Sequence, residues 1–380
     1  MDKIIVHIDL NCFFVQCEIR EHPELAGKPV AIGHEGKRGV ISTSSYEARA
    51  LGVFSGMPVS TARAKSKDLI LVPGHYSLYQ RYSKNFFSFL KKKYPVLEQA
   101  SIDECYIDMT KEADRDHLHD YLFDLSMELY RATKLKCSIG VGWTKFLAKM
   151  GSDYKKPLGI TIFTRENFQK MLFPLSIDKM FGIGKKSAPK LVDLGIKTIG
   201  DFYHYTFPEE KKILGSYYET LKDHLNGLGD DFVDSSSFDP KSISAERTFL
   251  NDESNEDEIS EMIYQCAKDC HKELVKYHKV TDCIGLKYRT PDFVTKSKRL
   301  SIEKKTDSLE VISSIAQQIF QSIYHGQSFR LIGVMLERVE TLSSSKERDQ
   351  SFDSLLSSLN EKLSSDNQLT TLGKTKHESQ

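Results

Sequence analysis

The sequence has no long apolar run, no excess of charge of one sign and few cysteines. None of its hydrophobic runs approaches the roughly 20 residues that a membrane helix needs, which excludes an integral membrane protein built from helices. The amino end has no basic region followed by an apolar core, so we expect no secretory signal. Its 7 cysteines are an odd number in a chain of 380 residues and predict no disulfide framework. We therefore expect a protein of the reducing cytoplasm.

What is present is the composition of a globular protein. Hydrophobic residues make up 39% of the chain and charged residues 28%, which leaves enough apolar mass for several cores. At about 150 residues per domain, the length favours two or three domains. The 53 basic and 53 acidic side chains cancel, so any nucleic-acid surface must come from the local distribution of charge rather than from its total.

The residue pattern changes several times along the chain. Strands and helices alternate up to about Phe163, whereas the stretch from Arg165 to Asp230 shows short helices and Gly-rich turns without a convincing strand. A polar linker, VDSSSFDPKSIS, follows, and then Ala245–Glu340 combines helices with strand-like runs. The remaining residues are rich in Ser, Lys and Glu, which is typical of a disordered tail. We predict a mixed α+β fold with more than one domain.

Two acidic sites could carry metal chemistry. Asp9 ends the apolar run IIVHID, and Asp103 and Glu104 interrupt the apolar alternation of SIDECYID. An isolated Asp at a strand end is more often a turn or helix cap, and adjacent carboxylates are compatible with an exposed hairpin turn. If a fold placed all three on neighbouring strands, they would bind divalent cations such as Mg²⁺, which prefer oxygen ligands. Sequence spacing alone does not bring the sites together.

Four strings follow one another along the chain in a characteristic order and spacing: DLNCFFVQCE, GVISTSSYEARALGVFSGMP, SIDECYIDMT and KFLAKMGSDYKKP. The chain resembles the Y-family of translesion DNA polymerases, most closely its DinB branch, from about Lys3 to Arg338. The resemblance implies a right-hand fold with a palm, fingers, a helical thumb and a C-terminal little finger. The implied regions are 1–10 and 74–163 (palm), 11–73 (fingers), 164–230 (thumb), 231–243 (linker), 244–340 (little finger) and 341–380 (flexible tail).

The same resemblance implies an activity. The enzyme would be a template-directed DNA polymerase of low fidelity that adds deoxynucleotides to a primer 3′ end and carries no proofreading exonuclease. Asp9, Asp103 and Glu104 match the catalytic carboxylates of the family, which with the backbone carbonyl at Leu10 would hold two Mg²⁺ ions. The implied partners are primer–template DNA and deoxynucleoside triphosphates, and we expect a monomer.

The resemblance also assigns substrate contacts. Of the pair Phe13–Phe14, one ring would lie in the core and Phe14 would act as the steric gate against a ribose 2′-hydroxyl. Ser42 matches the small residue that the family places over the nascent base pair. Without the family context, Arg49 would be interpreted as a solvated residue on a surface helix. Within that context, Tyr46 lies on the same helix face, so both side chains could reach one triphosphate. The implied substrate contacts are Phe14, Ser42, Thr43, Tyr46, Arg49 and Lys156.

Two regions are candidates for binding DNA. FGIGKKSAPKLVDLG resembles a helix–hairpin–helix whose glycines would let backbone N–H groups face a phosphate, although a plain helix-capping turn fits as well. Between positions 287 and 305 there are seven basic and two acidic residues, which predicts either a phosphate-binding surface or a solvated charged face. The candidates are Gly182, Gly184, Lys185 and Lys186 in the first region, and Lys287, Arg289, Lys296, Lys298 and Arg299 in the second.

Two features leave the assignment open. Asn11 stands where DinB proteins typically have a second Asp, whereas the UmuC-like branch resembles this sequence in having Asn there. A UmuC-like DNA- and clamp-binding subunit, whose activity depends on a partner, is therefore an alternative. A metal-dependent nuclease would share the carboxylates but would need no triphosphate site. In the tail, QLTTLG resembles peptides that bind the sliding clamp, although it lacks their usual large hydrophobic ending. Its predicted clamp-binding residues are Gln368, Leu369 and Leu372.

Overall fold

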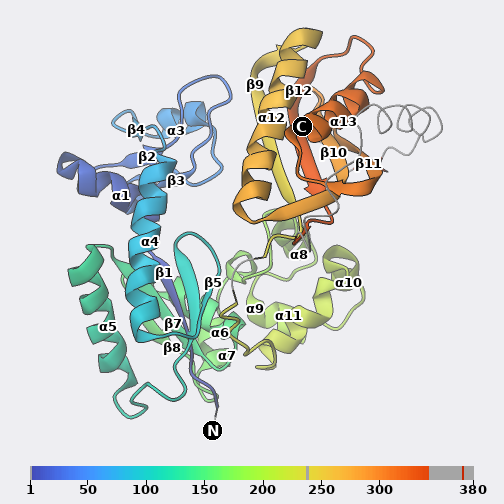
Figure 1. Cartoon of the computed structure of the whole chain (residues 1–380). Helices are drawn as coiled ribbons and strands as arrows, with labels where there is room; N and C mark the ends of the chain where they lie inside the picture. Colours follow the sequence, from blue (N-terminus) through green and yellow to red (C-terminus); the bar gives the residue numbers. More distant parts are fainter. Residues whose placement is uncertain (1, 237–238, 342–369, 372–380) are drawn as a thin grey trace. The chain divides into compact units, whose positions relative to one another are not determined.

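A computed structural model describes residues 2–236, 239–341 and 370–371 (Figure 1). The chain divides into two compact units, Met1–Ser236 and Ser237–Gln380. Each unit combines β-sheet with helices, which confirms the predicted mixed α+β class. Over the described residues, every helix is too short or too polar to cross a lipid bilayer. All seven cysteines are free thiols.

The first unit is built around a five-stranded sheet with the strand order β5-β6-β1-β7-β8. The central strand β1 is antiparallel to both of its neighbours, and it is buried along its whole length as its apolar sequence predicts. β8 pairs parallel with β7 at one edge. The strands are β1 (Ile5–Leu10), β5 (Leu97–Gln99), β6 (Glu104–Asp108), β7 (Cys137–Gly142) and β8 (Ile160–Ile162).

The two faces of β1 have different neighbours. Because side chains alternate along a strand, Val6 and Ile8 pack into the largest core of the unit, together with apolar residues of α4 (Tyr76–Lys93) and α5 (Leu118–Thr133). His7 and Asp9 point to the other face, where they meet side chains of α6 (Lys145–Tyr154). The alternation therefore gives the sheet one apolar face and one face that carries polar chemistry.

Helix α6 lies directly against the sheet because two glycines remove the side chains between them. A Cβ atom on Gly140 of β7 would lie 2.0 Å from the carbonyl oxygen of Ala148, and one on Gly151 would lie 2.9 Å from Gly140 Cα. No side chain fits at such distances, so the backbones of strand and helix are in contact at this point. The contact carries the polar residues of α6 up to the face that holds His7 and Asp9.

A smaller three-stranded sheet and its helices follow β1 in the sequence. Strands β2 and β3 pair antiparallel, while β4 pairs parallel with β2. Ser45 caps the next helix by accepting a hydrogen bond from the Ala48 N–H. The elements are α1 (Phe13–Glu21), the 3₁₀ helix η1 (Pro23–Leu25), β2 (Val30–Ile32), β3 (Thr43–Ser44), α2 (Tyr46–Ala50), α3 (Val59–Lys65) and β4 (Ile70–Val72).

Residues 165–230 form a helical subdomain without a strand, as the Gly-rich sequence predicts. Its short helices bury an apolar cluster that includes Phe202 and Leu221 and is shared with Phe146 and Leu147 of α6. The elements are α7 (Phe168–Leu172), the 3₁₀ helix η2 (Ile177–Lys179), α8 (Ala188–Asp193), α9 (Ile199–His204), α10 (Glu209–Leu214) and α11 (Tyr217–Leu225).

The second unit is a sheet with the order β14-β11-β10-β12-β9, whose apolar side chains pack against two helices, α12 and α13. Its last strand, β14, lies in the part of the chain for which the sequence predicts a flexible tail, and its backbone pairs with β11. The elements are β9 (Ile243–Glu253), α12 (Glu256–Lys276), β10 (Lys279–Arg289), β11 (Thr295–Thr306), α13 (Leu309–Gln321), β12 (Phe329–Glu337), β13 (Glu340–Thr341) and β14 (Thr370–Thr371).

Candidate active site

Strand pairing brings the two acidic sites of the sequence together. Asp9, near the end of β1, lies directly opposite Glu104, the first residue of β6. One residue further, the Leu10 N–H donates to the carbonyl of Asp103 at 3.0 Å. The pairing supplies the neighbouring-strand arrangement that a shared cation site requires and that sequence spacing alone could not provide.

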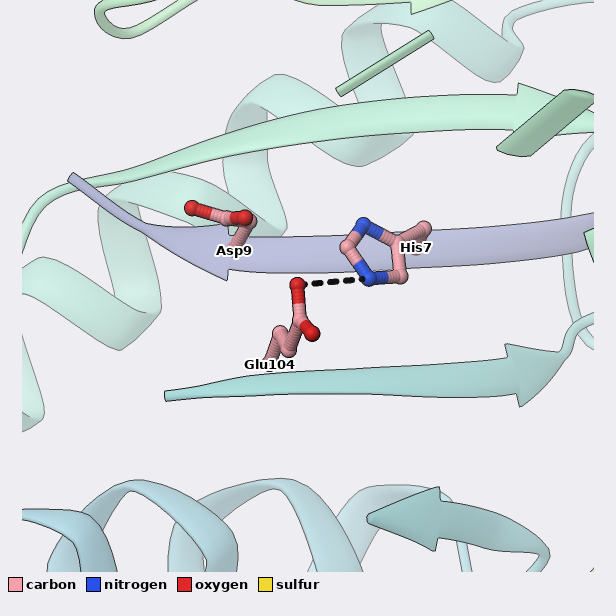
Figure 2. Close-up of side chains that lie close together, drawn as sticks. All are labelled: His7, Asp9 and Glu104. Carbon is pink, nitrogen blue, oxygen red and sulfur yellow. Dashed lines mark ion pairs between the residues drawn. The ribbon is translucent and has the colours of Figure 1, made fainter. Parts of the chain in front are cut away.

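The polar centre of the site contains His7, which the sequence motifs do not single out. Ligand atoms of His7, Asp9 and Glu104 all lie within 4.8 Å of one another (Figure 2). His7 precedes Asp9 by two positions, so both side chains leave the same face of β1. That spacing is the sequence signal that could have found His7.

Asp103 is held slightly apart from this cluster. Its Oδ1 atom accepts a hydrogen bond from the Ser101 hydroxyl at 2.6 Å, which fixes the carboxylate beside the entry to β6. Burial raises the pKa of Asp103, and the negative charges of Asp9 and Glu104 raise it further. Three carboxylates therefore repel one another here, and a bound cation would relieve that repulsion.

Two lysines from α6 and its C-terminal end reach the carboxylates. Lys149 Nζ lies 2.7 Å from Glu104 Oε2 and 3.0 Å from Asp9 Oδ2, so a single ammonium group contacts both acids. Lys156 Nζ lies 2.8 Å from Asp9 Oδ2, whereas its neighbour Lys155 is exposed. The geometry separates these two adjacent lysines, which the sequence alone could confuse.

The charges of the site reinforce one another. Burial alone would raise the pKa of Glu104, but the adjacent His7 side chain and the charge of Lys149 lower it well below its usual range. Burial alone would lower the pKa of Lys149, but the carboxylates of Asp9, Asp153 and Glu104 raise it instead. Glu104 is thus ionised, and the point between Asp9 and Glu104 stabilises positive charge.

Asn11 makes structural contacts on both sides of its amide. The buried side chain donates from Nδ2 to the Ser138 hydroxyl at 2.8 Å and accepts at Oδ1 from the Leu158 N–H at 3.0 Å. An ionised Asp could accept the second bond but could not donate the first. The departure from the usual DinB residue therefore affects the packing of β7 and the loop after α6, not the carboxylate centre.

The two adjacent phenylalanines lie in different environments. Phe13 is 2% exposed and belongs to the core, whereas Phe14 is partly exposed. The Phe14 ring stacks face to face on Tyr79 of α4, with ring centroids 4.2 Å apart and an angle of 11° between planes. Tyr79 in turn donates its hydroxyl to the fully buried Glu18 at 2.5 Å. The position of Phe14 is fixed through this stack.

The segment that precedes and forms α2 presents an aromatic and a cationic side chain. Arg49 lies over the Tyr46 ring, 4.8 Å from its centroid, and its Nε donates to the Ser44 carbonyl at 3.1 Å. Burial raises the pKa of Tyr46 to about 12. Its buried hydroxyl has no hydrogen-bond partner among the described residues, so it remains a protonated donor for a ligand. Ser42 is exposed and Thr43 half-buried at the start of the same segment.

The predicted helix–hairpin–helix is shorter than its name implies. The helix directly before the glycines is the three-residue 3₁₀ helix η2, and α8 follows them. Gly182 has a φ of +96°, and a Cβ there would lie 2.7 Å from the Tyr217 ring, so this position needs glycine. Gly184 faces open space, and Lys185 and Lys186 are exposed. The turn presents backbone and two ammonium groups to solvent.

The basic run of the second unit is divided between two faces of its sheet. Lys298 is only 8% exposed and donates to the Ser322 hydroxyl at 3.1 Å, beside the helices. By alternation Lys296 leaves the same face. The opposite face carries Lys287, Arg289 and Arg299. Of these, Lys287 pairs with Glu246 at 2.5 Å and Arg299 with Glu337 at 2.9 Å.

Comparison with known proteins gives the same identification as the motifs. The model of the impB/mucB/samB family matches residues 8–153, and that of its C-terminal domain matches residues 240–352. The DNA polymerase IV of Oceanobacillus iheyensis is 36% identical over 347 residues, which cover 89% of this chain and 82% of that protein. A Lactococcus lactis subsp. cremoris DNA polymerase IV is 35% identical, covering 87% of this chain and 92% of the relative. The chain belongs to the Y-family of DNA polymerases.

Solved structures agree with this placement of the polymerase. A Y-family polymerase chimera of Dbh and Dpo4 superposes with a TM-score of 0.77 at 25% identity and covers 89% of this chain and 100% of its own. The insertion ternary complex of Dbh DNA polymerase gives a TM-score of 0.63 over the same coverage. The right-hand architecture with palm, fingers, thumb and little finger is thereby confirmed.

The enzyme is a DNA-directed DNA polymerase of the translesion type and belongs to the DinB branch. Its relatives at 33–36% identity are named DNA polymerase IV, and they span nearly the whole chain. The alternative of a non-catalytic, partner-dependent subunit is not favoured by these matches. The doubt that Asn11 raised about the branch is resolved in favour of DinB.

Proposed function

We propose that Asp9, Asp103 and Glu104, with the backbone carbonyl of Leu10, hold two Mg²⁺ ions at which the polymerase extends a primer. The observation that supports this is the Lys149 ammonium group, which contacts Asp9 and Glu104 together and marks a point where the chain stabilises a cation. Oxygen ligands of this kind suit Mg²⁺. When bound, the two ions would supply Lewis-acid activation of the primer 3′-hydroxyl and of the α-phosphate.

The remaining residues of the site would bind and select the nucleotide. Tyr46 would donate its unpaired hydroxyl to the triphosphate, and Arg49 and Lys156 would neutralise its charge. Phe14, held on Tyr79, would exclude a ribose 2′-hydroxyl. Thr43 would line the triphosphate, and the exposed Ser42 would leave room over the nascent base pair.

The regions of the hand follow the predicted boundaries in this proposal. The palm would comprise residues 1–10 and 74–163, the fingers 11–73, the thumb 164–230 and the little finger 244–340. The thumb would contact a DNA phosphate through Gly182, Gly184, Lys185 and Lys186. In the little finger, the open sheet face supports DNA binding by Lys287, Arg289 and Arg299, whereas Lys296 and Lys298 lie on the helix side.

The division of the basic run predicts opposite results for two adjacent residues. Arg299→Gln should make the slope of log DNA affinity against log salt concentration shallower by about one, because the Arg299 side chain lies on the open face of the sheet. Lys298→Gln should leave that slope unchanged, since Lys298 contacts Ser322 among the helices. The measurement is primer–template affinity by fluorescence anisotropy across a range of NaCl concentrations. A slope that falls only in the Lys298 variant would contradict this assignment of faces.

Two further predictions stand as they were made from the sequence. Binding of the sliding clamp would involve Gln368, Leu369 and Leu372, which lie outside the described residues. A cytoplasmic location would place the enzyme beside the chromosomal DNA that a polymerase of this family extends.

The test of the proposed chemistry is extension of a labelled primer–template with four deoxynucleotides. We expect extension with Mg²⁺, none with excess chelator, and recovery when Mg²⁺ is restored. Omission of the template strand is the control, since a template-directed enzyme then adds nothing. Shortening of the primer instead of its extension would indicate a nuclease and would contradict the proposal.

A further inference from the structure

His7 has no role in the chemistry proposed above, yet it lies at its centre. The side chain is fully buried on β1, with its ring 4.6 Å from the Tyr106 ring of β6. Figure 2 shows one edge of the imidazole turned toward Glu104, with Asp9 on the same strand. A buried polar ring beside a carboxylate needs partners for both of its nitrogens.

One ring nitrogen has a hydrogen-bond partner on α6. His7 Nδ1 lies 2.8 Å from the hydroxyl oxygen of Ser152 on α6. That hydroxyl donates its single proton to the Lys149 carbonyl at 2.9 Å, so towards His7 it acts as an acceptor. In the tautomer that satisfies both contacts of this hydroxyl, Nδ1 carries the proton of the neutral imidazole and Nε2 carries a lone pair.

The other nitrogen has no hydrogen-bond partner among the described residues. Nε2 is buried and lies 3.4 Å from Glu104 Oε2, which is itself an acceptor. Two lone pairs that face each other in a buried site are unfavourable unless a donor or a cation lies between them. The position where that group would lie adjoins the carboxylate of Asp9.

We propose that His7 Nε2 is a nitrogen ligand of the cation held by Asp9 and Glu104. The inference rests on the proposed metal site and adds a fourth side chain to it. A separation of 3.4 Å suits two adjacent ligand atoms that each lie about 2.1 Å from one ion. The bond from Nδ1–H to Ser152 is the kind of anchor that fixes the ring orientation of a ligating histidine.

The ammonium group of Lys149 is compatible with this arrangement. It shares Glu104 Oε2 with the proposed ion, but Asp153, one turn further along α6, lies 3.6 Å away on its other side. The ammonium can therefore shift toward Asp153 while the ion takes its place between the acids. The nitrogen ligand would also favour cations that accept imidazole, such as Co²⁺, relative to Mg²⁺.

The test is pulsed electron paramagnetic resonance on the untagged full chain with one equivalent of Mn²⁺ as the probe. We expect a ¹⁴N coupling from a directly bound imidazole, replaced by a ¹⁵N coupling when histidine is labelled with ¹⁵N. The coupling should disappear in His7→Leu and persist in His75→Gln, a matched control whose imidazole contacts Glu18 instead. The exchange of ¹⁴N for ¹⁵N coupling in the wild-type protein tests histidine ligation by itself, so the result does not depend on whether a variant folds.

The possible outcomes separate this inference from the metal site itself. Saturable Mn²⁺ binding that is lost in Asp9→Asn, without any histidine coupling, would overturn the role of His7 and leave the carboxylate site standing. Absence of saturable Mn²⁺ binding would overturn both. Ser152→Ala supplies a second readout, since loss of the anchor should weaken Mn²⁺ binding about 10-fold with an unchanged circular dichroism spectrum. Equal affinity in that variant would contradict the anchoring step.

Discussion

Replacing Glu104 with glutamine should lower the rate of primer extension about 1,000-fold while leaving DNA affinity within about twofold. The variant loses a metal ligand and with it about 4 kcal/mol of transition-state stabilisation, at about 1.4 kcal/mol per factor of ten in rate. Glutamine keeps the volume of the side chain but not its charge. Glu104 contacts Lys149 and faces His7 and Asp9, so the loss falls at the centre of the charged cluster. Single-nucleotide incorporation in a quench-flow instrument measures the rate, and anisotropy measures the affinity.

A control on the same strand separates chemistry from folding. Asp108 ends β6 and accepts a hydrogen bond from the Thr110 N–H at 3.0 Å, a bond that asparagine can also accept. Asp108→Asn should therefore extend primers at the wild-type rate. If Glu104→Gln extends primers at that rate too, the carboxylate is not a ligand of the catalytic metal and the site must lie elsewhere.

Replacing Phe14 with alanine should admit ribonucleotides, with discrimination against them reduced roughly 100-fold because a steric contact with the 2′-hydroxyl disappears. The stack on Tyr79 makes the wild-type ring a rigid obstacle, since the ring cannot turn aside without losing that contact. The measurement is kcat/KM for a ribonucleoside triphosphate and for its deoxy counterpart on the same template.

The adjacent phenylalanine provides the comparison. Phe13→Leu changes a core residue and should lower the melting temperature without altering sugar discrimination. If Phe14→Ala retains full discrimination, another side chain is the gate. If instead Phe13→Leu is the variant that admits ribonucleotides, the two rings have been assigned in the wrong order.

The carboxylate site was predictable only through the family motifs. Composition and alternation place Asp9 at a strand end and mark Asp103 and Glu104 as anomalous in a buried strand, but they give no pairing between residues almost 100 positions apart. The register between β1 and β6, which places Asp9 opposite Glu104, is a property of the folded sheet. Once the register is known, the adjacency of the acids follows directly.

The basic run shows what a count of charges omits. The stretch that contains Lys298 and Arg299 was interpreted as one surface, but it forms the strand β11, in which neighbouring side chains leave opposite faces. The strand itself was not predicted, since its alternation places basic residues on both faces. Without the strand assignment, the sequence could not distinguish a residue beside the helices from one on the open face.

Lys149 was within reach of sequence reasoning. Lys149 and Asp153 lie one turn apart on one face of a helix, close to Lys156, which matches the family motif. The missing information was the direction of that face. It is set by the contact of α6 with the sheet, which depends on two residues without side chains.

Those two residues, Gly140 and Gly151, have a consequence for mutational tolerance. Neither carries a functional group, yet a methyl group on Gly140 would lie 2.0 Å from a carbonyl oxygen and would force the helix away from the strand. Lys149, Ser152 and Lys156 would move with it. In a random mutagenesis screen, these positions should therefore yield inactive proteins as readily as the acidic residues do, and an assay of damage tolerance would score them as though they were catalytic.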